Sequence, residues 1–106
     1  MSYTEMQKLM RIAEVLERYL ESGRFAHVLW YLTPLMRSPF AFWEGLADYL
    51  ATHDKRPLQK ISQPDVFRYL LEYGKNMDGV DETELKSMLA ADFSQHEHKD
   101  APWFLR

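Results

Sequence analysis

The sequence predicts an all-α protein, a single domain folded as a compact orthogonal array of about five helices. Apolar residues recur at three- and four-residue intervals, helix start signals precede these segments, and no stretch alternates as a strand would. The chain has 106 residues, of which 46% are hydrophobic and 14% aromatic. This composition is enough for one hydrophobic core without disulfides or metals.

The first helix is expected over residues 5–20. Thr4 and Gln7 have the spacing of a capping box, and Gly23 is expected to stop the helix. The apolar stripe that predicts its buried face is Met6, Leu9, Ala13, Leu16 and Leu20.

A second, shorter helix is expected over residues 24–31, with Pro34 ending or kinking it. The third is expected over residues 39–53, because Ser38-Pro39 places an N-cap residue before a proline at the first helical position. Its aromatic residues are predicted to be core rather than a stacking platform, because they follow helical spacing. They are Phe40, Phe42, Trp43 and Tyr49.

The fourth helix is expected over residues 63–76, after Ser62, and the fifth over residues 82–95, after Asp81 with Glu84 three positions later. Apolar residues cover roughly 160° of the third helix and roughly 200° of the fourth. We therefore expect these two helices at the centre of the array.

Composition excludes several classes of function. The net charge is −3 and no basic run exceeds Lys55-Arg56, which argues against nucleic-acid binding. The absence of cysteine excludes a disulfide framework, a thiolate zinc site and an iron–sulfur cluster held by this chain. No apolar run approaches the ~20 residues that span a bilayer, so no membrane partner is expected. We expect a cytoplasmic protein.

Asp92 and His96 lie four residues apart on the predicted apolar face of the fifth helix. A charged residue is rarely buried unless it is paired, so we predict a hydrogen-bond partner for Asp92. The favoured interpretation is structural, with Asp92 accepting from a tyrosine, an arginine or a backbone N–H and His96 capping the helix end. The alternative is an acid–histidine pair that lines a pocket or docking surface.

A small metal-dependent enzyme is the least favoured interpretation. It would use His96 and His98 with Asp92 or Asp100, but a His-x-His pair points to different sides of a helix. The spacing of the sequence places no third strong metal ligand beside them, so no metal site is predicted.

No catalytic residue is predicted either. Glu44 and Asp48 have the chemistry of an acid pair for general acid–base work, but their position predicts a solvated helix face. No nucleophile–base constellation, Gly-rich phosphate loop or HExxH motif is present.

Near the end of the sequence stand Pro102, Trp103 and Phe104. Exposed aromatic side chains often mark interaction sites, which predicts an anchor for another domain. The alternative is a tail folded back over the domain's own core. Both apply if the chain is part of a longer protein.

Four segments together resemble a known family. They are residues 22–25 (Ser-Gly-Arg-Phe), residues 38–49 (Ser-Pro-Phe-Ala-Phe-Trp-Glu-Gly-Leu-Ala-Asp-Tyr), residues 91–99 and residues 102–104. In this order they resemble the C-terminal helical domain of unknown function of bacterial cobalamin-binding radical SAM proteins. Such proteins are often labelled magnesium-protoporphyrin IX monomethyl ester cyclase-like.

The resemblance implies that residues 1–106 are a non-catalytic accessory domain, a C-terminal fragment of a larger protein or a part encoded separately. The parent would bind a [4Fe–4S] cluster and S-adenosylmethionine in a cysteine-bearing barrel, and cobalamin in a Rossmann-like domain. This chain has no Cys-x₃-Cys-x₂-Cys motif, so no cofactor is expected in it. Its expected partners are those domains of the same polypeptide.

Under this hypothesis the domain docks on the barrel, and the candidate docking or pocket residues are Asp92, His96, Pro102, Trp103 and Phe104. The alternative hypothesis is a stand-alone helical protein-interaction module with no link to radical chemistry.

Overall fold

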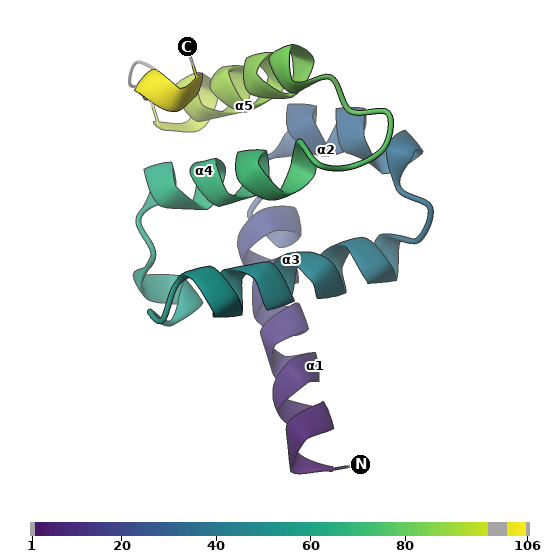
Figure 1. Ribbon diagram of the computed structural model, residues 1–106. Coiled ribbons are helices and arrows are strands. Elements are labelled where there is room, and N and C mark those ends of the chain that lie inside the picture. The colour runs from purple at the N-terminus through teal and green to yellow at the C-terminus, as the bar shows by residue number, and fades with distance from the viewer. Residues whose placement is uncertain (1, 98–101, 106) are drawn as a thin grey trace.

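Helices make up the secondary structure of the computed structural model, which describes residues 2–97 and 102–105 (Figure 1). The α-helices in this part of the chain are α1 (Tyr3–Val15), α2 (Ala26–Leu32), α3 (Pro39–His53), α4 (Gln63–Gly74) and α5 (Glu82–Glu97). A π-helical turn η1 (Leu16–Glu21) continues α1, and the 3-10 turns are η2 (Thr33–Leu35), η3 (Leu58–Lys60) and η4 (Trp103–Leu105). The described residues form no strand, which confirms the predicted all-α class.

The helices are stacked, with α4 between α3 and α5 (Figure 1). The second helix packs against α5, and α1 crosses α3 and extends away from the other helices toward the N-terminus. Both predicted central helices carry wide buried faces. The buried residues of α3 are Phe42, Trp43, Leu46, Ala47 and Leu50, and those of α4 are Val66, Phe67, Tyr69, Leu70, Leu71 and Gly74. No described helix has the length and apolar character needed to cross a membrane.

Two helix starts are where the sequence predicts them. Ser38 Oγ accepts a hydrogen bond from the backbone N–H of Ala41 at 3.2 Å, directly before Pro39 at the start of α3. At the start of α5, one carboxylate oxygen of Asp81 accepts from the backbone N–H of Thr83 at 2.8 Å. Each acceptor satisfies a backbone donor that the helix itself leaves free.

The predicted start of the first helix is wrong by two residues. Ser2 is the N-cap, and its Oγ accepts from the backbone N–H of Glu5 at 3.1 Å. Thr4 therefore lies inside α1, where it cannot act as the capping residue. With η1 counted as the continuation of α1, the other boundaries differ from the prediction by two residues or fewer at each end.

The face of α1 that enters the core also differs from the predicted one. The predicted core positions Met6, Leu9 and Leu20 are 51%, 44% and 50% exposed. The buried side chains of α1 and η1 are Ile12, Val15 and Tyr19. These three also have helical spacing, so the helix has two apolar faces and only one of them is covered.

Tyr19 explains which face is covered. Its ring is fully buried, with its centroid 4.9 Å from that of Phe25, which in turn lies 4.4 Å from that of Phe67. The hydroxyl of Tyr19 donates to the carbonyl oxygen of Val66 at 2.9 Å. The buried ring and its satisfied hydroxyl fix the face that carries Tyr19 against the core.

Arg18 holds the same end of α1 to the loop before α4. Its guanidinium donates to the carbonyl oxygens of Leu58 at 2.5 Å and Ile61 at 2.9 Å. These bonds join α1 to the carbonyl groups of η3 and of the residue that follows it, and they turn this cation inward.

The aromatic residues of α3 are core with one exception. Phe42 and Trp43 are buried and Tyr49 is partly buried, as predicted. Phe40 is 56% exposed, so its predicted place in the core is wrong. It lies in the first turn of α3, beyond the reach of α4 and α1.

Truncation of the two faces of α1 is expected to have unequal effects. Ile12→Ala should lower the free energy of unfolding by about 2–5 kcal/mol, because Ile12 is 5% exposed and its loss leaves a cavity. Leu9→Ala should change it by less than about 1 kcal/mol, because that side chain is largely hydrated already. Urea denaturation measures both values, and equal losses would contradict the assigned face.

Candidate functional site

Asp92 is the buried acid of the core, and the structure confirms that it has hydrogen-bond partners. Its side chain has no exposed surface. One carboxylate oxygen accepts from the backbone N–H of His27 at 3.1 Å, and the other accepts from that of Val28 at 2.9 Å. Both donors belong to the first turn of α2, so Asp92 caps a helix distant in sequence.

The start of α2 needs this acceptor because its own N-cap residue provides none. Phe25 occupies the cap position and forms no side-chain hydrogen bond there. An aromatic side chain cannot accept the orphan N–H groups of a first turn. The carboxylate of Asp92 does so, and its negative charge lies at the positive end of the helix dipole.

His27 is the histidine that contacts Asp92, and sequence reasoning missed it. Its Nδ1 lies 2.7 Å from a carboxylate oxygen of Asp92, while the imidazole is 52% exposed. The sequence signal was indirect, because a helix start without a local cap needs an acceptor and a buried acid needs donors. Matching these two requirements would have paired Asp92 with the start of the second helix.

His96 lies in the last turn of α5 and is partly exposed. The alternative, a pairing of His96 with Asp92, does not form, because both oxygens of Asp92 are directed at α2. The favoured interpretation, in which Asp92 accepts from a backbone N–H, is the one that the structure shows. Within the described ranges, no group of three or more histidine or acidic residues is arranged to hold a metal ion. His98 and Asp100, which belonged to the metal hypothesis, lie outside the described residues.

The Pro-Trp-Phe segment is partly folded onto the core and partly presented to solvent. Trp103 is 81% exposed, while Phe104 packs against the core and their rings meet edge to face with centroids 5.7 Å apart. Leu105, which sequence reasoning did not single out, is 4% exposed, and its backbone N–H donates to the carbonyl oxygen of Pro102 at 2.9 Å. The η4 turn is thus anchored by Leu105 and holds Trp103 outward.

A chain of ion pairs joins the loop after α3 to α4. Asp54 accepts from Arg56 at 2.6 Å and from the hydroxyl of Tyr69 at 2.9 Å, and Arg56 also contacts Asp65 at 3.1 Å. The hydrogen bonds from Arg56 hold the pKa of the Asp54 carboxyl far below its usual value. Glu44, predicted on a solvated face, contacts Lys8 of α1 at 3.2 Å.

Tyr49 of α3 contacts α4 through Glu72, to whose carboxylate its hydroxyl donates at 2.7 Å. Burial raises the pKa of Tyr49 to about 12, and the hydrogen bond to the Glu72 carboxylate adds to the shift. The ring stacks on that of His53 with centroids 3.9 Å apart. These contacts hold α3 and α4 together.

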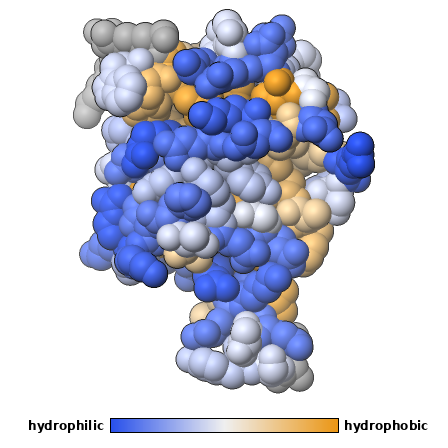
Figure 2. All heavy atoms as spheres, in the orientation of Figure 1, coloured by the Kyte–Doolittle hydropathy of each residue, from blue (hydrophilic) through white to orange (hydrophobic). Residues whose placement is uncertain are grey.

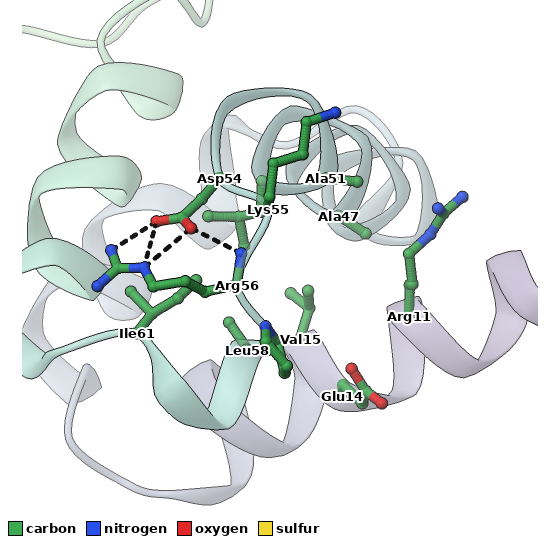
Figure 3. A pocket seen from close by; sticks show the side chains of 12 residues that line it. Arg11, Glu14, Val15, Ala47, Ala51, Asp54, Lys55, Arg56, Leu58 and Ile61 are labelled. Atoms are coloured by element: carbon green, nitrogen blue, oxygen red, sulfur yellow. Dashed lines mark hydrogen bonds and ion pairs between the residues drawn. The ribbon is translucent and has the colours of Figure 1, made fainter.

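A pocket of about 330 Å³ lies between α1, α3 and the loop that follows α3 (Figure 3). Its apolar lining is Val15, Ala47, Leu50, Ala51, Pro57, Leu58 and Ile61. Arg11 and Lys55 extend on either side of Ala47 and Ala51, while Arg56 is neutralised by Asp54 (Figure 3). Among the described residues that line it, none is a serine, histidine or cysteine, so they offer shape and charge rather than a nucleophile–base pair.

The fold and these contacts define a small all-α domain whose polar groups hold helices together. The chain belongs to the family described as Protein of unknown function (DUF4080), whose model matches residues 1–106. No curated protein and no solved structure matches the chain.

Removal of the Asp92 cap is expected to destabilise the fold more than removal of a local cap. Asp92→Ala should lower the free energy of unfolding by roughly 2–4 kcal/mol, because two backbone donors lose their acceptor inside the protein. The matched control is Asp81→Ala at the exposed start of α5, with an expected loss of about 0.5–2 kcal/mol. Chemical denaturation measures both, and an Asp92→Ala loss no larger than the control's would contradict a buried cap.

The Tyr49 hydroxyl is expected to make the fold sensitive to alkali. The unfolded phenol ionises near pH 10 and the folded one only near pH 12, so the free energy of unfolding should fall as the pH rises between these values. Tyr49→Phe should make this decline shallower, and Glu72→Gln should lower the pKa of Tyr49. Urea denaturation across this pH range, with ultraviolet titration, measures both effects. An unchanged decline in Tyr49→Phe would show that other groups cause it.

Proposed function

We propose that this chain is a non-catalytic accessory domain of a bacterial, cytoplasmic, cobalamin-binding radical SAM enzyme of the magnesium-protoporphyrin IX monomethyl ester cyclase-like type. It docks on the catalytic barrel of that protein and helps to close the substrate site. The resemblance of residues 22–25, 38–49, 91–99 and 102–104 supports this assignment. Family membership identifies a domain of unknown function and by itself names no chemistry.

The observation that carries the docking role is the exposure of Trp103 on an anchored turn. An indole that is 81% exposed presents a large apolar area to water. The packed Phe104 and the buried Leu105 fix the backbone directly after Trp103. A preorganised tryptophan loses little conformational entropy on binding, which is why such residues dominate interface energies.

The other candidate residues act differently in this proposal. Asp92 has no exposed surface, so it cannot contact a partner directly. Its role is to hold α2 against α5 and so to keep the docking surface in shape. His96 is partly exposed near the end of α5, the helix against which η4 packs, and extends the docking edge. The cluster, S-adenosylmethionine and cobalamin are bound by the other domains of the parent.

The genomic sequence around this chain tests the parent assignment directly. The same reading frame, or a neighbouring one, is expected to encode a Cys-x₃-Cys-x₂-Cys barrel and a cobalamin-binding domain. A frame that begins at Met1 with no such partner nearby would overturn the proposal. The alternative hypothesis, a stand-alone protein-interaction module, would then be favoured.

The role of Trp103 is tested by amide hydrogen exchange in the full-length parent and in this chain alone. Exchange at the backbone amides of residues 103–105 is expected to be at least about tenfold slower in the parent, because docking covers η4. Trp103→Ala in the parent should abolish that protection, and the matched control Trp30→Ala, at 74% exposure on α2, should leave it intact. Equal exchange in the two contexts would exclude docking through η4.

A further inference from the structure

The first three turns of α1 carry a second apolar face that the other described residues leave exposed. Its members are Tyr3 (76% exposed), Met6 (51%), Leu9 (44%) and Met10 (58%), with the exposed Ala13. At 100° per residue they fall within a sector of about 120°, while Ile12 and Val15 point into the core from the other side. We call the five outward residues the outer face of α1.

This face lies where α1 extends beyond the other helices (Figure 1). In Figure 2 this projecting part is mostly hydrophilic or neutral on the side in view, and apolar side chains are visible at its edges. A contiguous apolar surface of this kind on a soluble domain marks an interaction site. Its spacing at positions 3, 6, 10 and 13 is that of the contact seam between two helices.

The charges along this helix identify the partner. Glu14, Glu17 and Glu21 border or continue the outer face toward its C-terminal end, and none forms an ion pair with a described residue. Two cations of this helix are turned inward, because Lys8 pairs with Glu44 and Arg18 binds loop carbonyls. Arg11 is exposed three residues before Glu14, and both line the pocket beside α3. The outer face is therefore apolar, with more glutamates than exposed cations along its border.

We propose that the outer face of α1 binds an amphipathic helix whose apolar ridge is flanked by lysine or arginine. Such a helix covers the methionines and supplies the charges that the glutamates lack. A second copy of this chain fits poorly in a parallel pairing, because the two acidic borders would meet, and an antiparallel pairing is an outcome that the oligomeric state tests. An anionic membrane surface repels the same border. The inference does not depend on the radical SAM assignment, since it rests on α1 alone.

Two synthetic three-heptad peptides test the proposal. Both have leucine at the seam positions, and one has lysine while the other has glutamate at the flanking positions. Fluorescence anisotropy with the intact chain is expected to show at least about tenfold tighter binding of the lysine peptide. Equal affinities, or no binding of the lysine peptide, would overturn the proposal.

Variants of the chain locate the binding. Met6→Ser combined with Met10→Ser should weaken binding of the lysine peptide at least about tenfold, whereas Trp30→Ser, an exposed aromatic on α2, should leave it unchanged. Glu14→Lys with Glu17→Lys should reverse the preference between the peptides. Circular dichroism and the thermal midpoint verify that each variant folds, which is expected because these side chains are largely exposed or on the surface.

Two further measurements decide between occupants. Light scattering of the chain alone should report a monomer, and sedimentation with phosphatidylglycerol vesicles should leave it in solution. A dimer lost in the Met6→Ser, Met10→Ser variant would assign the face to a second copy and overturn the proposal. Vesicle binding lost in that variant would assign it to a membrane surface, with the same consequence.

Discussion

The contact between the Asp92 carboxylate and the first turn of α2 is the constraint on which the rest of this fold depends. Without it, the start of α2 would carry unsatisfied N–H groups in the protein interior, because Phe25 provides no acceptor. The cap sets where α2 begins, which places Phe25 between Tyr19 and Phe67. That aromatic cluster in turn sets the rotation of α1 about its axis. One polar contact between α2 and α5 thus determines which face of α1 meets the core.

The outward-facing apolar groups follow from this arrangement. Burying Tyr19, Val15 and Ile12 leaves Met6 and Met10 on the opposite side of α1. At the other end of the chain, burying Leu105 leaves Trp103 exposed on the same turn. In both places a short helical segment has more apolar side chains than one core contact can cover, because side chains around a helix point in different directions. The uncovered ones form the surfaces for which we propose partners.

Several polar contacts connect elements that are distant in the chain. Arg18 binds carbonyl groups before α4, Tyr49 binds Glu72, and Asp54 joins the loop after α3 to Tyr69 of α4. Each contact satisfies groups that would otherwise lose hydration on folding. Asp92 and Glu44, which look like catalytic candidates in the sequence, are occupied by contacts of this kind.

The sequence by itself determined the helical class, the starts of α3 and α5, and the need of Asp92 for a partner. These depend on interactions within about four residues, such as the cap at Ser38, or on the cost of burying a charge. Only the tertiary structure decided that the partner is the start of α2, that Tyr19 rather than Leu20 enters the core, and that Leu105 anchors Trp103. Periodicity reports that a helix has apolar faces, but it does not rank two such faces. That ranking depends on burial and hydrogen bonds with residues more than forty positions away, which exist only once the chain has folded.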